Sequence, residues 1–288
     1  MKLTNDKKIL IVGLGLIGGS YAKALTKKGY RVSAITRSPS TIAYALQHGM
    51  IAEGTTKIDP EMIGKADIVV LALYPKVLLS WLEENQQYLK PGAVLTDVTG
   101  VKGCIVYDVQ KMLRSDVEFI AAHPMAGREV YGVENSDDAI FKNANYIVTP
   151  TEKNTEEAII LCHQLGYELG FARVSCLTPE KHDDMIGFLS QLTHCIAIAL
   201  MNCNETPGME AYTGDSFRDL TRIARINDQM WSELFMCNRQ QLLSHMDVFS
   251  ESFAAMRQML EQGDVEGMRE AMRKSTARRM LFDKKTDR

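Results

Sequence analysis

The chain has 288 residues, of which 24% are charged and 45% are hydrophobic, and its formal net charge is −3. This length fits one large domain or two of ordinary size. High apolar content with a small net charge excludes a largely disordered protein. Because there is no basic excess, the composition also argues against a binder of nucleic acid or of membrane surfaces.

The N-terminus is polar, and no apolar run approaches the roughly 18–20 residues that a membrane span needs, so we expect neither a signal peptide nor a span. Six cysteines are scattered along the chain without a Cys-x-x-Cys pair. In a chain of this length they predict reduced, mostly buried thiols in a cytoplasmic protein, and the spacing gives no indication of a metal site.

The first 177 residues alternate short apolar runs with helical stretches. Several of the runs are β-branched and unalternated, as expected for strands that are covered on both faces. The predicted strands are 8–12, 30–36, 66–73, 93–98, 118–122, 146–149 and 172–176, and the predicted helices are 18–28, 40–48, 76–88, 105–113 and 155–169. This alternation predicts an α/β, Rossmann-type, doubly wound parallel sheet over residues 1–177.

The sequence pattern changes near Thr178-Pro179-Glu180. No proline follows Pro207, and eleven of the sixteen methionines lie from Met185 onward. We expect an all-helical second domain over residues 178–288, with helices that start at Pro179 and near Asn227-Asp228. Methionines of this kind fill a core, and so much apolar surface could also form a dimer interface.

A glycine motif follows the first predicted strand: Gly13-Leu14-Gly15-Leu16-Ile17-Gly18. Gly13 permits a tight turn, Gly15 lets the backbone approach a pyrophosphate, and Gly18 allows the next helix to pack closely on the strand. The helix N-terminus offers N–H groups to the phosphates. The motif alone is weak evidence, but at the first strand of an α/β pattern it indicates a dinucleotide site.

The second predicted strand ends in Thr36-Arg37-Ser38, without the acidic residue that binds the ribose of NAD in many such sites. Thr36 and Ser38 can hydrogen-bond a 2′-phosphate, and Arg37 can pair with its charge. Alternatively, Arg37 is an exposed cation that stacks on adenine. The sequence therefore favours NADP and leaves NAD possible.

Two polar segments, 96–103 and 123–129, follow predicted strands at the carboxyl edge, where open α/β sheets bind ligands. His123, at the end of a strand near the expected nicotinamide, is suited to accept a proton from a hydroxyl during hydride removal. Alternatively, His123 is a structural residue, which a single histidine in such a position is as often as it is a catalytic base.

The helical region carries two further polar groups of residues. If 179–201 is one helix, Asp183, Ser190 and His194 share a stripe, because offsets of seven and eleven residues return to within about 20° of the starting direction. Such a stripe faces either a ligand or an inter-helix hydrogen-bond network. Residues 216–225 carry three arginines among apolar residues, either as a carboxylate site or as a salt-bridged helix face.

Taken together, these segments resemble the prephenate/arogenate dehydrogenase family over nearly the whole chain. The matching pieces are GLGLIGGS at 13–20, DVTGVKG at 97–103, HPMAGRE at 123–129, the stretch 141–150, HDD…SQLTH at 182–194 and FRDLTRIA at 217–224. The resemblance implies a Rossmann domain, a helical dimerisation domain and a homodimer formed through the helical domains. It also implies NAD(P)-dependent oxidative decarboxylation of prephenate to 4-hydroxyphenylpyruvate, or of arogenate to tyrosine, in tyrosine biosynthesis. We expect the single-function form, without a chorismate mutase or ACT extension.

The resemblance also implies roles for individual residues. His123 is the hydrogen-bond acceptor of the substrate hydroxyl and its base, and Arg222 clamps the ring carboxylate. His194, with Ser190, orients the substrate. Two further residues match family positions around the pocket, in supporting roles: Asp183 and Trp231.

The sequence departs from the family pattern at three places. Thr99-Gly100 replaces the usual Gly-Ser, so a serine hydroxyl is missing and Thr99 is the candidate replacement. Arg128 stands where the family has Ser or Thr, either as a cation near the substrate or as a surface residue. The usual SHLPH reads SQLTH at 190–194.

Retention of His194 favours prephenate, because some arogenate-specific relatives lack this histidine, and Arg128 would repel the ammonium group of arogenate. Two other classes of protein remain as alternatives. The first is another reductase with a Rossmann domain and a helical dimerisation domain, such as a β-hydroxyacid dehydrogenase or a pyrroline-carboxylate reductase. The hydroxyacid enzymes depend on a lysine in the helical domain, yet residues 189–242 contain none. A sensor that binds NADP without turnover is the second alternative.

Overall fold

The computed structural model describes residues 3–283. The chain divides into two compact units, Met1–Arg239 and Gln240–Arg288. The predicted boundary between residues 177 and 178 falls inside the first of these units, so it stays a prediction.

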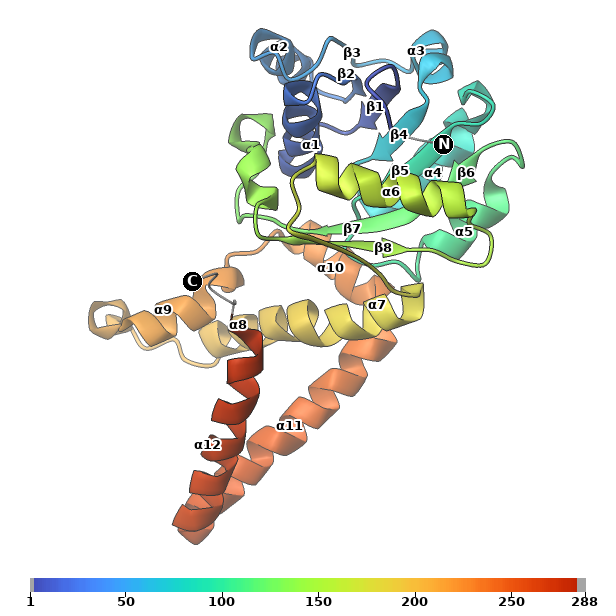
Figure 1. Ribbon diagram of the computed structural model, residues 1–288. Helices are drawn as coiled ribbons and strands as arrows, with labels where there is room; N and C mark the ends of the chain where they lie inside the picture. The colour runs from blue at the N-terminus through green and yellow to red at the C-terminus, as the bar shows by residue number, and fades with distance from the viewer. Residues whose placement is uncertain (1–2, 284–288) are drawn as a thin grey trace, which may run out of the picture. The chain divides into compact units, whose positions relative to one another are not determined.

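A six-stranded parallel sheet forms the centre of the first unit, with the order β3-β2-β1-β4-β5-β6 (Figure 1). Its strands are β1 (Lys8–Val12), β2 (Arg31–Ile35), β3 (Glu53–Thr55), β4 (Ile68–Leu71), β5 (Val94–Asp97) and β6 (Glu118–Phe119). This is the order of a doubly wound Rossmann sheet. The predicted fold class is confirmed.

Helices cover both faces of this sheet. One core contains side chains of α1 (Leu16–Lys27), α2 (Pro39–Gln47) and α6 (Glu156–Glu168). The other contains side chains of α3 (Pro60–Lys65), α4 (Pro75–Asn85) and α5 (Val106–Met112). All five predicted helices are present with shifted ends, whereas β3 and α3 were missed because three and six residues are too few to show a period.

The predicted strand 118–122 is wrong, because the chain changes sheets at Ile120. β7 (Ala121–Met125) pairs antiparallel with β8 (Asn145–Thr149), which pairs parallel with β9 (Arg173–Cys176) in a separate sheet. The main chain still follows β5 through Ile120, but at Ala122 the N–H donates to the Asp97 side chain instead of a main-chain carbonyl. His123 therefore lies within β7, opposite Ile147, and not at the end of a strand as expected.

A long helix follows the second sheet. It comprises α7 (Pro179–Ile186), the π-helical turn η4 (Gly187–Leu192) and α8 (Thr193–Asn202), and the Thr178 side chain caps it by accepting from Lys181 N. The predicted start at Pro179 is confirmed. The π-helical turn lies between Asp183 and His194, so the offsets assumed for a regular helix do not apply along it.

By length and apolar composition, residues 179–202 could cross a membrane, which the sequence analysis did not anticipate. However, His182, Asp183 and Gln191 are buried in this helix, and their side chains bond to β7, the loop after β5 and α10. A core helix of a folded domain has these contacts.

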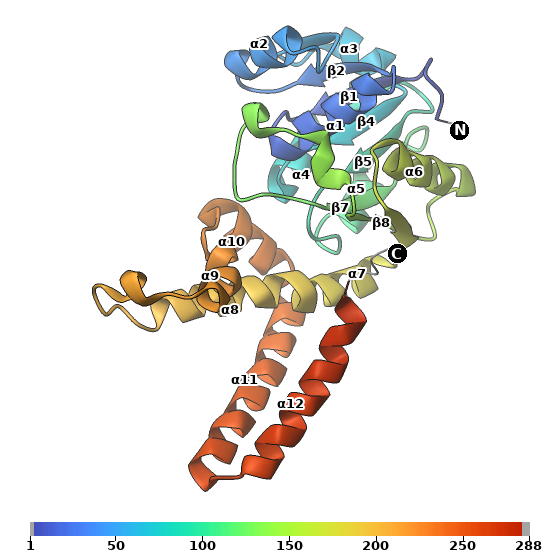
Figure 2. The ribbon, with the colours of Figure 1, turned by 60° about the vertical axis from the view of Figure 1, so that its left-hand side comes forward.

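Shorter helices lie beside α8 in both views (Figures 1 and 2): α9 (Asp215–Thr221), the 3₁₀ turn η6 (Arg222–Ala224) and α10 (Asp228–Cys237). Asn227 caps α10 by accepting from Met230 N, so the helix start predicted near Asn227-Asp228 is confirmed.

The second unit is a helical hairpin of α11 (Arg239–Gln262) and α12 (Val265–Arg279). Gly263 makes the turn at φ +65°, and Asp264 caps α12. Large apolar side chains are exposed along both helices and just after α12: Leu243, Met246, Val248, Phe249, Phe253, Met256, Leu260, Val265, Met272, Met280, Leu281 and Phe282.

Candidate active site

The glycine turn after β1 fits a dinucleotide. Gly13 has φ +97°, and a Cβ there would lie 2.3 Å from the carbonyl oxygen of Ala72. A Cβ on Gly18 would lie 2.0 Å from the carbonyl oxygen of Gly13, so only glycine lets α1 pack this closely. At Gly15 no atom lies within 4 Å of a Cβ position, so this side of the turn is open to a ligand.

The amino end of α1 faces the same opening. Gly15 is its N-cap residue and has no side chain that could accept from the first-turn N–H groups. These groups can therefore bind a pyrophosphate. The structure brings all the predicted residues of this motif together in one turn: Gly13, Leu14, Gly15, Leu16, Ile17 and Gly18.

The predicted 2′-phosphate site lies at the end of β2, beside the glycine turn, where Gly13 N donates to Ile35 O at 2.8 Å. Ser38 has a structural task there, because its Oγ accepts from Thr41 N and caps α2. Thr36 is half-buried and Arg37 is exposed. Of the three predicted contacts, the Arg37 guanidinium is thus the most open to solvent.

A buried ion pair holds the loop after β5. Lys102 is fully buried, and its Nζ lies 2.7 Å from Asp97 Oδ2 and donates to Ala122 O at 2.5 Å. The Thr99 hydroxyl donates to Asp97 Oδ2, accepts from Lys102 Nζ at 3.2 Å and lies 2.9 Å from Val101 O. Such a pair is stable only when all its partners are present. Thr99 thus lies inside this network, and its role as a substrate-binding residue stays a prediction.

Beside this network, two histidines and an aspartate form a chain. His123 Nδ1 lies 2.8 Å from His182 Nε2, and His182 Nδ1 lies 2.7 Å from Asp183 Oδ1. Asp183 also accepts from the backbone N–H groups of Lys102 and Gly103, at 2.8 and 2.7 Å. The predicted supporting residue Asp183 therefore connects α7 to the loop after β5.

The two imidazoles of this chain are neutral at neutral pH. Burial holds the pKa of His123 well below its usual range, and the nearby His182 and Lys102 lower it further. Burial also lowers the pKa of His182, although Asp183 opposes this shift. A neutral imidazole can accept a proton, as a general base must.

The outer edge of His123 faces the loop after β5. A Cβ built on Gly100 would lie 3.8 Å from His123 Nε2 and 3.6 Å from Leu234 Cδ1 of α10. Gly100 occupies the position where the resemblance expects serine. The missing hydroxyl would therefore stand next to the nitrogen that is proposed to act as the base.

Restoring that hydroxyl is expected to raise activity. Gly100→Ser fits without strain, because its nearest neighbours lie at ordinary contact distance. One added hydrogen bond to the reacting hydroxyl, of about 1 kcal/mol, would raise kcat about fivefold. Gly100→Ala is the control, since it adds the Cβ alone, and steady-state kinetics compare the three proteins. Equal kcat values for Gly100→Ser and Gly100→Ala would contradict this expectation.

A second cluster lies where α8 meets α10. The His194 ring stacks on Trp231 with centroids 3.7 Å apart, and its Nδ1 donates to the main-chain carbonyl of Ser190 at 2.8 Å. Arg222 Nη1 donates to Glu129 Oε1 at 2.6 Å. Burial lowers the pKa of His194, Glu129 raises it and Arg222 lowers it, so both charged groups lie near this ring.

Helix α10 links the two clusters. Leu234 faces Gly100, whose Cβ position also borders His123, and Trp231, three residues earlier, packs on His194. Residues three apart share a helix face, so both clusters border the same side of α10. That His123 and Arg222 contact one bound substrate stays a prediction.

Arg128 is not part of either cluster. It is 49% exposed, and its Nη2 pairs with Asp137 at 3.0 Å. Three further residues of the site were not predicted from the sequence: His182, Lys102 and Glu129. His182 directly precedes Asp183, and Glu129 ends the HPMAGRE segment, but only the fold shows what these side chains contact.

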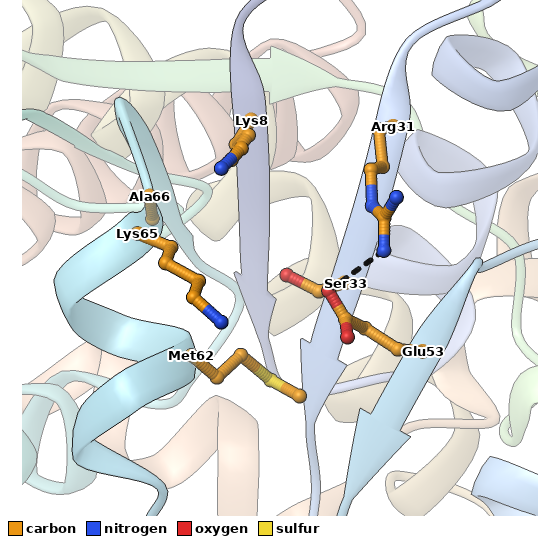
Figure 3. Close-up of a pocket in the computed structure, with 7 residues that line it drawn as sticks. All are labelled: Lys8, Arg31, Ser33, Glu53, Met62, Lys65 and Ala66. Carbon is orange, nitrogen blue, oxygen red and sulfur yellow. Dashed lines mark ion pairs between the residues drawn. The ribbon is translucent and has the colours of Figure 1, made fainter.

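Figure 3 shows a small pocket elsewhere on the sheet, lined by Lys8, Arg31, Ser33, Glu53, Met62, Lys65 and Ala66. Lys8 and Arg31 begin β1 and β2, so the pocket lies at the amino edge, opposite the glycine turn. Arg31 pairs there with Glu53 at 3.7 Å. This pocket is separate from the candidate active site.

A dinucleotide turn at the carboxyl edge of a Rossmann sheet, with a neutral imidazole beside the loop after β5 at the same edge, is the arrangement of an NAD(P)-dependent dehydrogenase. Comparison with known proteins narrows this class. The family model described as "Prephenate dehydrogenase, nucleotide-binding domain" matches residues 21–184, and "Prephenate dehydrogenase, dimerization domain" matches residues 178–274. The chain belongs to the prephenate dehydrogenase family and is an NAD(P)-dependent dehydrogenase.

Individual relatives support the same family assignment. The chain is 29% identical to the prephenate dehydrogenase of Bacillus subtilis, in an alignment that covers 90% of this chain and 72% of the relative. It is 27% identical to the cyclohexadienyl dehydrogenase of Zymomonas mobilis, in an alignment that covers 99% of this chain and 98% of the relative. The prephenate dehydrogenase of Aquifex aeolicus, solved with hydroxyphenyl propionate and NAD+, superimposes with a TM-score of 0.89 at 30% identity, covering 96% of this chain and 98% of that one.

The hydroxyacid alternative is not supported beyond the fold. A 3-hydroxyisobutyrate dehydrogenase of Salmonella typhimurium has a TM-score of 0.61 but only 14% identity, covering 87% of this chain and 95% of that one. At this level of identity the likeness concerns the fold alone.

Proposed function

We propose that this enzyme converts prephenate to 4-hydroxyphenylpyruvate and carbon dioxide, with NAD(P) as the oxidant, in tyrosine biosynthesis. The observation that carries the proposal is the neutral His123 imidazole, whose Nε2 faces the loop after β5. A base there can take the proton of a ring hydroxyl. The glycine turn at 13–18 would hold the dinucleotide, which supplies the hydride acceptor when it is bound.

In this mechanism the side chains move one proton and orient the substrate. His123 Nε2 draws the proton from the hydroxyl as the hydrogen on the same carbon leaves with its electron pair. Loss of the ring carboxylate as carbon dioxide then makes the ring aromatic, and His123 returns its proton to the phenolic oxygen. Arg222 holds the ring carboxylate, and His194, with Ser190 and Trp231, orients the side chain.

The other predicted site residues have supporting roles in this proposal. Thr99 positions Lys102 through the buried network, and Asp183 positions His123 through His182. Arg128 adds positive charge to the outer loop, where it pairs with Asp137.

The absorbance of the reduced dinucleotide tests the proposal. The purified enzyme is mixed with prephenate or arogenate and with NAD+ or NADP+. We expect turnover with prephenate. Turnover with arogenate alone would assign the alternative reaction, which gives tyrosine directly. Dinucleotide binding without turnover of either substrate would support a sensor and contradict the proposal.

We also propose a preference for NADP, carried by Arg37 with help from Thr36 and Ser38. Arg37→Ala is expected to lower kcat/KM for NADP+ about tenfold, because one exposed ion pair of about 1.4 kcal/mol is lost. The value for NAD+ should change less than twofold, since NAD+ has no 2′-phosphate. Initial rates with each dinucleotide measure both effects. An equal fall with both dinucleotides would show that Arg37 stacks on adenine instead.

The proposed assembly is a cytoplasmic homodimer formed through the helical region. The family model that matches residues 178–274 is described as a dimerization domain. The exposed apolar side chains along α11 and α12 provide the kind of surface that a partner covers. Sedimentation at micromolar concentration is expected to give twice the mass of the chain.

A further inference from the structure

His182 is a buried imidazole for which the proposed reaction has no direct use. Its exposure is 0%, and it lies between Asp183 and His123. We infer that His182 and Asp183 are positioning residues that fix the tautomer of His123, so that the unprotonated nitrogen is the one facing the substrate. The catalytic consequence rests on the proposed function, whereas the tautomer itself does not.

Asp183 sets the direction of the hydrogen bonds in this chain, because an ionised carboxylate only accepts hydrogen bonds. Asp183 accepts from the backbone N–H groups of Lys102 and Gly103, which fix both of its oxygens. Its Oδ1 also lies 2.7 Å from His182 Nδ1. That nitrogen must therefore donate, so the proton of a neutral His182 is on Nδ1.

The proton on His182 Nδ1 in turn sets the direction of the hydrogen bond between His182 and His123. With its proton on Nδ1, neutral His182 has a lone pair on Nε2, which lies 2.8 Å from His123 Nδ1. His123 Nδ1 must then donate. The proton of neutral His123 is thus on Nδ1 and its lone pair is on Nε2, the atom that faces Gly100. Without these partners an imidazole commonly carries its proton on Nε2, where it could not accept.

Acid would break this arrangement at His182 as well as at His123. A protonated His182 donates from Nε2, and His123 can then accept only on Nδ1, which leaves its proton on Nε2. The charged and titratable groups that face the pair are Asp183 on α7 and Lys102 and Asp97 around the loop after β5. Burial and Lys102 keep both rings neutral to lower pH than a free imidazole.

The first test observes the tautomer in the free enzyme and needs no substrate. Imidazole nitrogen shifts are recorded by NMR on ¹⁵N-histidine-labelled protein, and the His123 signals are assigned as those lost in His123→Gln. We expect His123 to carry its proton on Nδ1 in the wild type. A wild-type His123 with its proton on Nε2 would overturn the inference, even if the enzyme is active on prephenate.

The second test uses two replacements of His182. In His182→Phe the acceptor is gone, and kcat is expected to fall about 100-fold, with unchanged KM and dinucleotide affinity. In His182→Gln the side-chain carbonyl can still accept from His123 Nδ1, so kcat should recover to within about tenfold of the wild type. The acid limb of the kcat profile should also simplify in His182→Gln, because only His123 still titrates.

His163→Phe is the matched control. This histidine lies on α6, where it contacts Cys176 at 3.0 Å, and its replacement should leave kcat unchanged. If kcat falls equally in His182→Phe and His182→Gln, and the His123 tautomer is unchanged in both variants, then His182 only packs in the core. That result would overturn the inference. If His182→Phe does not fold, the inference is tested by the His123 tautomer of the wild type and by the kcat of His182→Gln. An inactive wild type with the expected tautomer would contradict the proposed function only.

Discussion

Replacing His123 with alanine is expected to lower kcat about 10²–10⁴-fold, the range for loss of a general base. The side chain is proposed to move a proton that leaves only as the reaction proceeds, so its loss should affect kcat much more than KM. Dinucleotide binding should be unchanged, because the glycine turn at 13–18 belongs to other elements. Steady-state kinetics with prephenate and a separate titration of the dinucleotide measure the two quantities.

The pH profile gives an independent check on the same residue. Burial and the neighbouring His182 and Lys102 hold the pKa of His123 below its usual range, so the active, neutral form persists to lower pH than for a free imidazole. Activity should therefore fall with acidity only below about pH 6.5, the ordinary histidine value. His123→Gln is expected to be nearly inactive at every pH, and its remaining activity should not show this fall at acidic pH. If the activity of His123→Gln still falls at the same pH, another group is the base.

The local features of the fold could be predicted from the sequence. The run 9–12 leads directly into the glycine motif, and both the buried strand and the turn are set by neighbouring residues. The capped starts of α7 and α10 are local in the same sense, because each cap lies within three residues of its partner. Patterns of this length are visible in a single sequence.

The second sheet was not predictable in the same way. Nothing in the run from Glu118 to Ala122 marks the change of sheet, which depends on the Asp97 carboxylate, 25 residues from Ala122, as the acceptor. The partnership of His123 with His182 spans 59 residues, and that of Glu129 with Arg222 spans 93. A sequence shows that such residues are present, but not which of them meet.

The largest expected effect on binding is at Arg222. Arg222→Ala should raise the KM for prephenate about 100-fold, because a bidentate, charge-assisted contact of about 3 kcal/mol with the ring carboxylate is lost. The kcat value should change much less, since the carboxylate is bound before the reaction begins. Arg222→Lys keeps the charge but not the planar fork, so its KM should lie between the two.

The ion pair between Glu129 and Arg222 allows a second test of the role proposed for Arg222. In the free enzyme its carboxylate lies 2.6 Å from Arg222 Nη1, and both side chains are partly exposed. Removing Arg222 leaves that carboxylate unpaired beside the place where the substrate carboxylate is proposed to bind, so part of the rise in KM would come from repulsion. Arg222→Ala combined with Glu129→Gln should therefore have a lower KM than Arg222→Ala alone, and the double-mutant cycle should show coupling. Additive effects would mean that Glu129 does not repel the bound substrate. A KM near wild type in Arg222→Ala would mean that the guanidinium does not bind the substrate carboxylate and serves only its surface pair with Glu129.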